Sequence, residues 1–355
     1  MNILFYITSV EHYKLDYDYK DYFGWGGTED YIFNITEGLK QKGYNITVGG
    51  HVVEGEFDGI HCKSYETLTT EFNHYDVVIG IKHVQFLKEL VGICTWDRSY
   101  VWVSIANFNK DWDDSSMVQI TNKELNDLKL LGLTGIVYNT NWHKNTEYLS
   151  KYNEISSHII PPAIMLEKFP TLIDKIPNSF IWSSDPFRGL SNLIDGWDKI
   201  KESMPDATLT ICYPHYVNHM LPIYFPEFLD DMEAVQLKYP EIKMIGSLPK
   251  TDLYELMMAR EYWVYPTEFE ETYCITALEM MKCRVKIITT KTGALPEVVG
   301  LNGTFFDLEG DIGDNIVSAI DKYNLNPRLE EAYAWANKNT YKHRVYMWEE
   351  LLNKI

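Results

Sequence analysis

Carboxylates spaced eight residues apart are the clearest candidates for chemistry in this sequence. The stretch "YPTEFEETYCITALEMM", residues 265–281, holds Glu268, Glu270, Glu271 and Glu279. An ionised carboxylate accepts hydrogen bonds and cannot donate them, so it suits the hydroxyl groups of a sugar. A plainer interpretation competes with this one: a solvated acidic loop followed by a glutamate on a helix surface. Spacing alone does not decide between the two.

Helical geometry favours one arrangement of two of these carboxylates. If the whole segment from Glu271 to Glu279 were helical, eight residues at ~100° each would leave the two side chains ~80° apart. They converge better if Glu271 lies in the loop and the helix begins near Tyr273. The backbone N–H groups of residues 272–275 would then point out of the helix start and form an anion site. This arrangement fits a nucleotide-sugar, with pyrophosphate at the helix start, ribose on one glutamate and the sugar near the other.

The elements that must position these residues alternate between short apolar runs and longer helical stretches. Several of the runs are apolar throughout, as expected for strands covered by helices on both faces. Helices are predicted over residues 28–43, with Gly43 as C-cap, and over 190–205, where Pro205 stops the helix. The pattern predicts an α/β protein with two doubly wound parallel sheets. The predicted strands are 2–8, 44–50, 76–81, 100–106, 135–140, 157–162, 179–184, 207–214, 242–247, 262–266 and 285–290.

A proline-rich segment marks the predicted domain boundary. A chain of 355 residues is large for one hydrophobic core, and two domains of ~150–200 residues are expected. Residues 159–179, "IIPPAIMLEKFPTLIDKIPNS", break the periodicity before a new strand begins. We therefore predict an N-terminal domain over 1–165 and a C-terminal domain over 166–339. The amphipathic, aromatic-rich segment 340–355 is predicted to form a helix that packs back on the first domain.

Charge and cysteine content narrow the class of partner and compartment. The net charge of −19 argues against an electrostatic grip on nucleic acid or on an anionic membrane, since both need clustered Lys and Arg. The five cysteines (Cys62, Cys94, Cys212, Cys274 and Cys283) are scattered and have no metal-binding spacing, which indicates reduced thiols in the cytoplasm. The start of the chain is typical of a buried strand rather than of a signal peptide. No run reaches the ~18 apolar residues of a membrane span.

The acidic stretch resembles the E-x7-E signature of the large family-4 (group 1) glycosyltransferases, which are retaining GT-B enzymes. In that signature a Pro-Ser/Thr pair precedes the first glutamate, and a small or Met-rich helix follows the second. Pro266, Thr267, Glu271 and Glu279 fit this register. Glu268 and Glu270 do not give the required spacing and are interpreted as loop charges. The family's usual Gly-Phe-Gly after the first glutamate is replaced by the bulkier Thr272-Tyr273-Cys274.

The resemblance extends over most of the chain. "MKCRVKIITTKTGALPEVVGLNGTFF" resembles the family's following strand and glycine loop, with Gly293 in register. "FIWSSDPFRGLSNLIDGW" resembles the start of its second domain, where Arg188 takes the place of a phosphate-binding lysine. Ser184 replaces an upstream arginine of many members, as in a subgroup with S-x-P-x-R-G-L. "GWGGTEDYIFNITEGLKQKGYNITV" resembles the Gly-Gly-x-Glu loop, in which Gly26 and Gly27 would let backbone N–H groups approach phosphates or the reacting sugar.

The resemblance implies a GT-B architecture, with two Rossmann-like domains facing a central cleft. It implies transfer of a hexose or similar sugar, with retention, from a nucleoside-diphosphate-sugar in the C-terminal domain to a glycan or other hydroxyl acceptor in the N-terminal domain. Neither an essential metal nor another cofactor is expected, and the one D-x-D match, Asp111-Trp112-Asp113, would lie in the wrong domain. The implied catalytic residues are Glu271, Gly27 and Arg188. The implied donor-binding residues are Gly26, Gly27, Ser184, Arg188, Thr272, Tyr273, Cys274, Ile275 and Glu279.

Three other functions stay open at this point. A phosphorylase or epimerase with the same architecture would turn over the donor without the usual acceptor. A base-modifying DNA glycosyltransferase shares the fold, although the acidic charge opposes it. A catalytically impaired sugar-binding protein is the non-enzyme alternative, because the upstream arginine is missing. The family's mid-domain histidine is missing as well, and Ser104 or Asn107 stands near its place.

Overall fold

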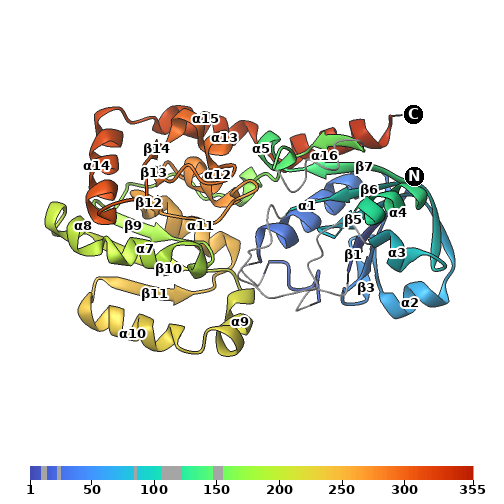
Figure 1. Cartoon of the computed structure of the whole chain (residues 1–355), viewed down its shortest axis with the longest axis horizontal. Helices are drawn as coiled ribbons and strands as arrows, with labels where there is room; N and C mark the ends of the chain where they lie inside the picture. The colour runs from blue at the N-terminus through green and yellow to red at the C-terminus, as the bar shows by residue number, and fades with distance from the viewer. Residues whose placement is uncertain (9–13, 22–24, 84–85, 105–121, 147–154, 355) are drawn as a thin grey trace. The chain divides into compact units, whose positions relative to one another are not determined.

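The chain folds into two compact units. The computed structural model describes residues 1–8, 14–21, 25–83, 86–104, 122–146 and 155–354. The first unit comprises Met1–Tyr19, Thr28–Pro162 and Tyr341–Ile355, and the second comprises Lys20–Gly27 and Ala163–Thr340. Each unit contains one sheet surrounded by helices (Figure 1).

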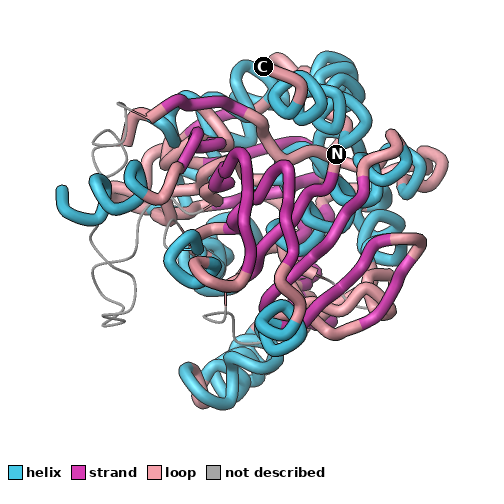
Figure 2. The backbone as a smooth tube through the Cα atoms, turned by 90° about the vertical axis from the view of Figure 1, so that its right-hand side faces the viewer, coloured by secondary structure: helices cyan, strands magenta, loops and turns pink. Residues whose placement is uncertain are grey.

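The sheet of the first unit is almost entirely parallel. Among the described residues it has eight strands in the order β3-β4-β2-β1-β5-β6-β7-β8, and only β3 runs antiparallel to its neighbour. Figure 2 shows such strands running side by side. The strands are β1 (Asn2–Ile7), β2 (Asn45–Gly50), β3 (Gly55–Phe57), β4 (Ile60–Ser64), β5 (Asn73–Ile81), β6 (Cys94–Trp102), β7 (Leu133–Tyr138) and β8 (Ser156–Ile159). The helices are α1 (Gly27–Gln41), α2 (Tyr65–Thr70), α3 (Phe86–Leu90), α4 (Asn122–Leu130), α5 (Asn141–Lys144) and α16 (Tyr341–Leu352).

The C-terminal helix α16 is an integral part of the first unit. The side chain of Trp348 is fully buried, and its indole N–H donates to the hydroxyl of Tyr31 in α1 at 2.6 Å. The two helices approach closely at Gly38, where an added Cβ would lie 2.2 Å from a methyl group of Val345. Arg98 in β6 donates to the backbone carbonyls of Leu352 and Lys354, which satisfies the carbonyl groups at the end of α16.

The sheet of the second unit is parallel throughout. Its six described strands have the order β11-β10-β9-β12-β13-β14. The strands are β9 (Ser179–Trp182), β10 (Thr208–Cys212), β11 (Ile242–Gly246), β12 (Tyr262–Tyr265), β13 (Lys286–Thr289) and β14 (Thr304–Phe305). The α-helices are α7 (Leu190–Asp195), α8 (Trp197–Ser203), α9 (Tyr216–Tyr224), α10 (Phe228–Lys238), α11 (Lys250–Ala259), α12 (Ile275–Lys282), α13 (Leu295–Val299), α14 (Ile312–Leu325) and α15 (Leu329–Lys338). Three 3₁₀ turns cover Leu166–Lys168, Pro186–Arg188 and Gly300–Asn302.

Both sheets are doubly wound, which confirms the predicted fold class. In the first sheet the strand order reverses between β1 and β5, and in the second it reverses between β9 and β12. All eleven predicted strands are present. Binding sites in such sheets lie outside the carboxyl ends of the strands at the point of reversal. In the second unit, that point is flanked by the loops after β9 and β12.

Residues 190–205 form two helices instead of the one predicted. Helix α7 ends at Asp195 and α8 begins at Trp197, with Gly196 between them. An added Cβ at Gly196 would lie 3.1 Å from the Cα of Gly313 in α14. The break therefore falls where the backbone of α14 comes close. The hydrophobic periodicity of the sequence does not reveal such a contact.

Candidate functional site

Loops from neighbouring strands meet at the carboxyl edge of the second sheet. The loop after β9 carries Arg188, the loop after β12 carries Glu271, and the loop after β13 carries Gly293. Because β9, β12 and β13 are adjacent and parallel, their carboxyl ends share one edge. This edge includes the point at which the strand order reverses, where a doubly wound sheet is expected to bind its ligand.

Backbone carbonyls hold the three loops together. The side-chain amide of Asn192 donates to the carbonyl of Pro266 at 2.9 Å. The hydroxyls of Thr290 and Thr292 donate to the carbonyl of Thr267 at 2.7 and 2.9 Å. Gly189 has φ +110°, and an added Cβ there would lie 2.4 Å from the oxygen of Pro266. The loops are thus fixed by local contacts before any ligand binds.

Glu271 is a buried carboxylate held by an arginine and a tyrosine. Glu271 is 7% exposed. One of its oxygens, Oε1, accepts from Arg188 Nη1 at 3.1 Å and from the hydroxyl of Tyr265 at 2.7 Å. The guanidinium of Arg188 also lies 4.1 Å from the ring centroid of Phe269, a cation–π geometry. The ion pair thus brings together Arg188, which the sequence predicted to bind phosphate, and Glu271, the first glutamate of the predicted signature.

The glycine loop after β13 fixes the backbone of Glu271. Gly293 has φ +60°, and an added Cβ would lie 2.5 Å from the nitrogen and 2.6 Å from the oxygen of Glu271. The amide of Ala294 donates to that same oxygen at 2.7 Å. Both the left-handed conformation and the close approach require glycine at position 293.

Glu279 is held in a second cluster of the same composition. It lies in α12 and is 2% exposed. Its Oε1 accepts from Lys250 Nζ at 2.5 Å and from the hydroxyl of Tyr254 at 2.9 Å. Both donors lie in α11, and the side chain of Lys250 is 16% exposed.

The two glutamates share one pattern. In each case a cation and a tyrosine hydroxyl both donate to Oε1. In the part of the chain that the structure describes, no hydrogen bond reaches Oε2 of Glu271 or of Glu279. A carboxylate oxygen can accept about two hydrogen bonds, so each Oε2 keeps its capacity to accept from ligand hydroxyls. The solvated-loop interpretation is wrong for these two residues, whereas Glu268 is exposed and Glu270 is half-buried, as expected for loop charges.

Helix α12 begins two residues later than predicted. Its first residue is Ile275, and Cys274 is the N-cap with φ +48°. The left-handed backbone at Cys274 turns the chain from the loop into the helix and leaves Glu271 outside it. Among the described residues, no acceptor takes a hydrogen bond from the backbone amides of Cys274 or Ile275. The helix start can therefore still serve an anion, with fewer amides than the predicted residues 272–275.

Burial and charge set the protonation of the side chains around Glu271. Burial, followed by the charge of Glu271, raises the pKa of the Tyr265 hydroxyl well above its usual range, so that it stays a donor. Burial and Glu271 likewise raise the pKa of the Cys274 thiol. Burial acts to lower the pKa of Arg188, but Glu271 and its other neighbours outweigh it and raise that pKa. Cys274 is thus a neutral thiol and does not supply a nucleophilic thiolate.

The other predicted site residues occupy less distinctive positions. Ser184 is buried, and its backbone carbonyl accepts from the indole N–H of Trp182 at 2.8 Å. Thr272 and Tyr273 are each 7% exposed and lie in the loop before Cys274. Gly26 precedes α1 and Gly27 is its first residue. The segment 20–27 belongs by its contacts to the second unit, and the roles of both glycines stay predictions.

Sequence reasoning missed three residues that hold the glutamates: Tyr265, Lys250 and Tyr254. Tyr265 lies in the predicted strand 262–266, and its position six residues before Glu271 gave no signal of contact. Lys250 and Tyr254 lie some 25 residues or more before Glu279 in the chain. Only the i, i+4 spacing of the two in a helix could have suggested a shared face.

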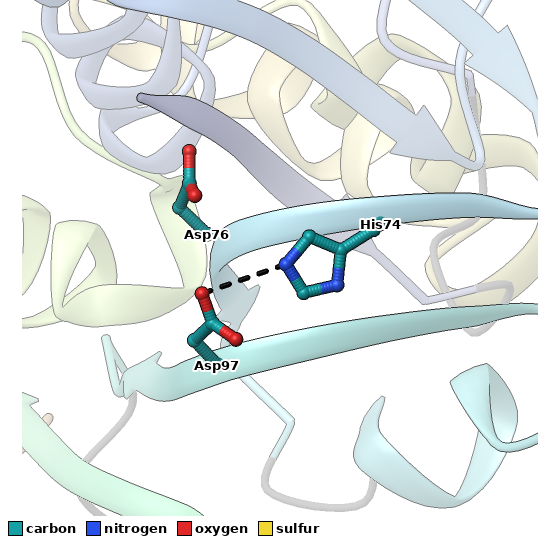
Figure 3. Close-up of side chains that lie close together, drawn as sticks. All are labelled: His74, Asp76 and Asp97. Atoms are coloured by element: carbon teal, nitrogen blue, oxygen red, sulfur yellow. Dashed lines mark ion pairs between the residues drawn. The ribbon is translucent and has the colours of Figure 1, made fainter.

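A histidine with two aspartates forms a cluster outside this site. The side-chain ligand atoms of His74, Asp76 and Asp97 lie within 4.8 Å of one another, and His74 forms an ion pair with Asp97 at 3.5 Å (Figure 3). The cluster lies at the amino ends of β5 and β6, away from the carboxyl edge of that sheet. His74 and Asp97 are exposed, and such surface groups are common without a metal. The D-x-D match Asp111-Trp112-Asp113, which is not predicted to be a metal site, lies outside the described residues.

The candidate site lies in a part of the chain that matches a known family model. Residues 184–343 match the family model of the glycosyl transferases group 1. The gpi3 subunit of phosphatidylinositol N-acetylglucosaminyltransferase from Schizosaccharomyces pombe is 24% identical over 217 residues, covering 57% of this chain and 46% of that protein. The O-antigen chain mannosyltransferase B of Escherichia coli is 33% identical over 92 residues, covering 26% and 22%. The chain spans less than half the length of these curated relatives.

The fold of the whole chain is similar to that of solved structures. The crystal structure of Anabaena Alr3699/HepE in complex with UDP-glucose matches with a TM-score of 0.68 and 13% identity, covering 100% of both chains. At that identity the likeness concerns the fold alone. It confirms the predicted two-domain, Rossmann-like GT-B fold. In the described residues, no helix combines the length and apolar character needed to cross a bilayer.

Proposed function

We propose that this chain, whose residues 184–343 match the family model of the glycosyl transferases group 1, moves a hexose from a nucleoside-diphosphate-sugar to a hydroxyl acceptor. One observation carries the proposal. Two buried carboxylates at the carboxyl edge of a doubly wound sheet are each held through one oxygen by a cation and a tyrosine. The second oxygen of each remains available for sugar hydroxyls.

Each part of the donor has a matching group in the second unit. Arg188 and the backbone amides at the start of α12 bind the diphosphate, since both favour negative charge. Glu279 binds the ribose and Glu271 binds the transferred sugar, because each glutamate presents a carboxylate oxygen that accepts hydrogen bonds from hydroxyl groups. The acceptor is assigned to the first unit, which carries the other doubly wound sheet. UDP-glucose is the first donor to try, because HepE binds it.

The proposed reaction retains the configuration at the anomeric carbon. The acceptor oxygen forms a bond to the anomeric carbon on the face from which the diphosphate departs. The bond between that carbon and the diphosphate oxygen breaks, its electron pair stays on the diphosphate, and the acceptor proton moves to the departing oxygen. Arg188 and the helix start stabilise the developing negative charge, which is electrostatic preorganisation. The neutral Cys274 thiol agrees with a mechanism without an enzyme nucleophile.

We assign this charge stabilisation to protein groups without a divalent ion. Chelation with EDTA is therefore expected to leave turnover unchanged, and loss of turnover that Mg²⁺ or Mn²⁺ restores would contradict the assignment. We also place the reaction in the cytoplasm, a proposal supported by all five cysteines being free and buried.

A thermal-shift panel of UDP-, GDP-, ADP- and dTDP-sugars tests donor binding. A donor at about 100 times its dissociation constant adds ~2.7 kcal/mol to the free energy of unfolding, so one member should raise the melting temperature clearly. The absence of a shift with all four classes would contradict the proposal. An Arg188→Met variant should lose most of the shift, because the diphosphate loses its cation.

A catalytically impaired binding protein is the second candidate. Ser184, in place of a family arginine, favours it, because one phosphate cation is missing at that position. Sugar transfer distinguishes the two candidates: donor binding without transfer to any glycan or small hydroxyl acceptor, and without donor hydrolysis, would support the impaired protein. Release of free sugar with no acceptor dependence would indicate a different GT-B chemistry.

A further inference from the structure

Helix α11 presents two donors to the same oxygen of Glu279. Lys250 and Tyr254 are one helical turn apart, so their side chains share a face of α11. Both donate to Oε1, at 2.5 and 2.9 Å, while Oε2 receives no hydrogen bond from the described chain. A carboxylate with two equivalent oxygens is here held asymmetrically.

A third side chain fixes the tyrosine. The ring of Phe169 stacks on that of Tyr254, with centroids 3.9 Å apart and planes 10° from parallel. Tyr254 is 2% exposed, so its hydroxyl has little freedom to leave Glu279. The order of contacts runs from Phe169 to Tyr254 to Glu279. A buried carboxylate in such a setting rotates only if two hydrogen bonds break together.

We propose that Lys250 and Tyr254 are positioning residues that direct Oε2 of Glu279 at the ribose hydroxyls of the nucleotide. The inference rests on the proposed function, which assigns the ribose to Glu279. Lys250 also supplies the cation that a carboxylate at 2% exposure needs to offset the cost of its burial. An oriented Oε2 can accept from the 2′- and 3′-hydroxyls, whereas a freely rotating carboxylate would not hold both.

The distinguishing property is discrimination between ribose and a sugar without hydroxyls. Removal of an orienting donor should weaken binding only where Glu279 has hydroxyls to contact. A general structural role would weaken every nucleotide equally. The test therefore measures, by calorimetric titration, the dissociation constants of UDP, GDP, ADP and dTDP and of their 2′,3′-dideoxy analogues, for wild-type and variant chains.

Lys250→Met and Tyr254→Phe are the test variants, and Lys286→Met is the matched control. Lys286 also pairs with a glutamate, Glu261, at 2.7 Å, with side-chain exposures of 17% and 20%. It also contacts a tyrosine hydroxyl, that of Tyr262 at 3.1 Å. This pair lies at the amino ends of β12 and β13, so its loss should not change nucleotide discrimination. Tyr254→Phe removes a single hydroxyl and keeps the stacked ring, which limits damage to folding.

The expected result is a loss of discrimination of about tenfold in Lys250→Met and a smaller loss in Tyr254→Phe, the scale of one hydrogen bond to a charged group. Lys250→Arg should recover part of it, and Lys286→Met should match wild type. Equal weakening of ribo- and dideoxynucleotides, or no weakening, overturns the positioning role alone. Failure of the wild-type chain to bind any of UDP, GDP, ADP and dTDP overturns it together with the proposed function.

Discussion

At the scale of single residues, burial separates glutamates that look alike in the sequence. Glu271 and Glu279 are enclosed and hydrogen-bonded, whereas Glu268, three residues before Glu271, is exposed. Enclosing a carboxylate costs free energy unless a cation and further donors compensate. Arg188 and Tyr265 provide this for Glu271. The arrangement keeps the carboxylate oriented without a ligand.

Tyr265→Phe tests whether orientation of Glu271 matters for transfer. The change removes the 2.7 Å hydrogen bond and keeps the buried ring. We expect a stability loss of about 1 kcal/mol and a fall in kcat of about tenfold, since Glu271 can then rotate within its enclosure. Steady-state sugar transfer and denaturant unfolding give the two numbers. Tyr262→Phe, whose hydroxyl contacts Lys286 at the other edge of the sheet, is the control. A normal kcat in Tyr265→Phe would refute the role.

Arg188→Met tests the coupling between the cation and Glu271. Loss of the partner leaves a buried carboxylate uncompensated, so stability should fall by about 1–3 kcal/mol, limited by the partial exposure of Arg188. The double variant Arg188→Met/Glu271→Gln should recover most of that stability, because the uncompensated charge is gone. Its affinity for UDP or GDP should stay at least tenfold below wild type, since the phosphate cation is still absent. Recovery of affinity along with stability would remove Arg188 from the diphosphate site.

At the scale of elements, the site depends on loops that fix one another through the backbone. The loop after β12 receives side-chain donors from α7 and from the loop after β13, and Gly293 lies against the backbone of Glu271. The apolar strands followed from the sequence because buried parallel strands have a strong pattern, whereas their order within each sheet did not. The short strands β3, β4 and β14 were missed, since two to five residues carry too little pattern.

Gly293→Ala tests the backbone contact at Glu271. Alanine at φ +60° costs about 1–2 kcal/mol, and the clash with the backbone of Glu271 adds about 1–3 kcal/mol and displaces that residue. Gly310→Ala is a matched control, because Gly310 has φ +83° and an added Cβ would meet nothing within 4 Å. We expect equal backbone strain in the two variants and loss of transfer only in Gly293→Ala. Comparable activity of the two would show that the close approach has no bearing on the site.

The start of α12 shows why the candidate site could be predicted only in part. The register of Glu271 and Glu279 came from local spacing and from the resemblance. The helix start depended on Cys274 adopting a left-handed backbone, which is uncommon for this residue type and is set by its surroundings. The hydrogen bonds from Lys250 and Tyr254 to Glu279 depend on the packing of α11 against α12, which are distant in the sequence. Tertiary contacts of this kind leave no periodic signal.

At the scale of the whole molecule, the chain returns to its first unit at the end. Helix α16 fills one side of that unit with the buried Trp348, whose ring lies 6.4 Å from that of Phe5 in β1. The second unit is bounded by Ala163 and Thr340, apart from residues 20–27. A change in α16 should therefore act on the first unit and leave the donor loops of the second intact.

Trp348→Ala tests this assignment. Removing a fully buried indole costs about 3–5 kcal/mol, and the cavity should form in the first unit. Hydrogen exchange should accelerate in peptides from β1, α1 and α16. Exchange in peptides covering β12 and α12 should stay as in wild type. Acceleration in β12 and α12 equal to that in β1 would contradict the assignment of α16 to the first unit's core.

The central claim is that the carboxyl edge of the second sheet binds a nucleotide-sugar. Hydrogen exchange of the wild-type chain, with and without saturating UDP-, GDP-, ADP- and dTDP-sugars, tests it most directly. We predict that one of these donors slows exchange in residues 183–192 and 265–279, the segments that carry Arg188, Glu271 and Glu279. Unchanged exchange in both segments with all four donor classes, or protection confined to other segments, would contradict the claim.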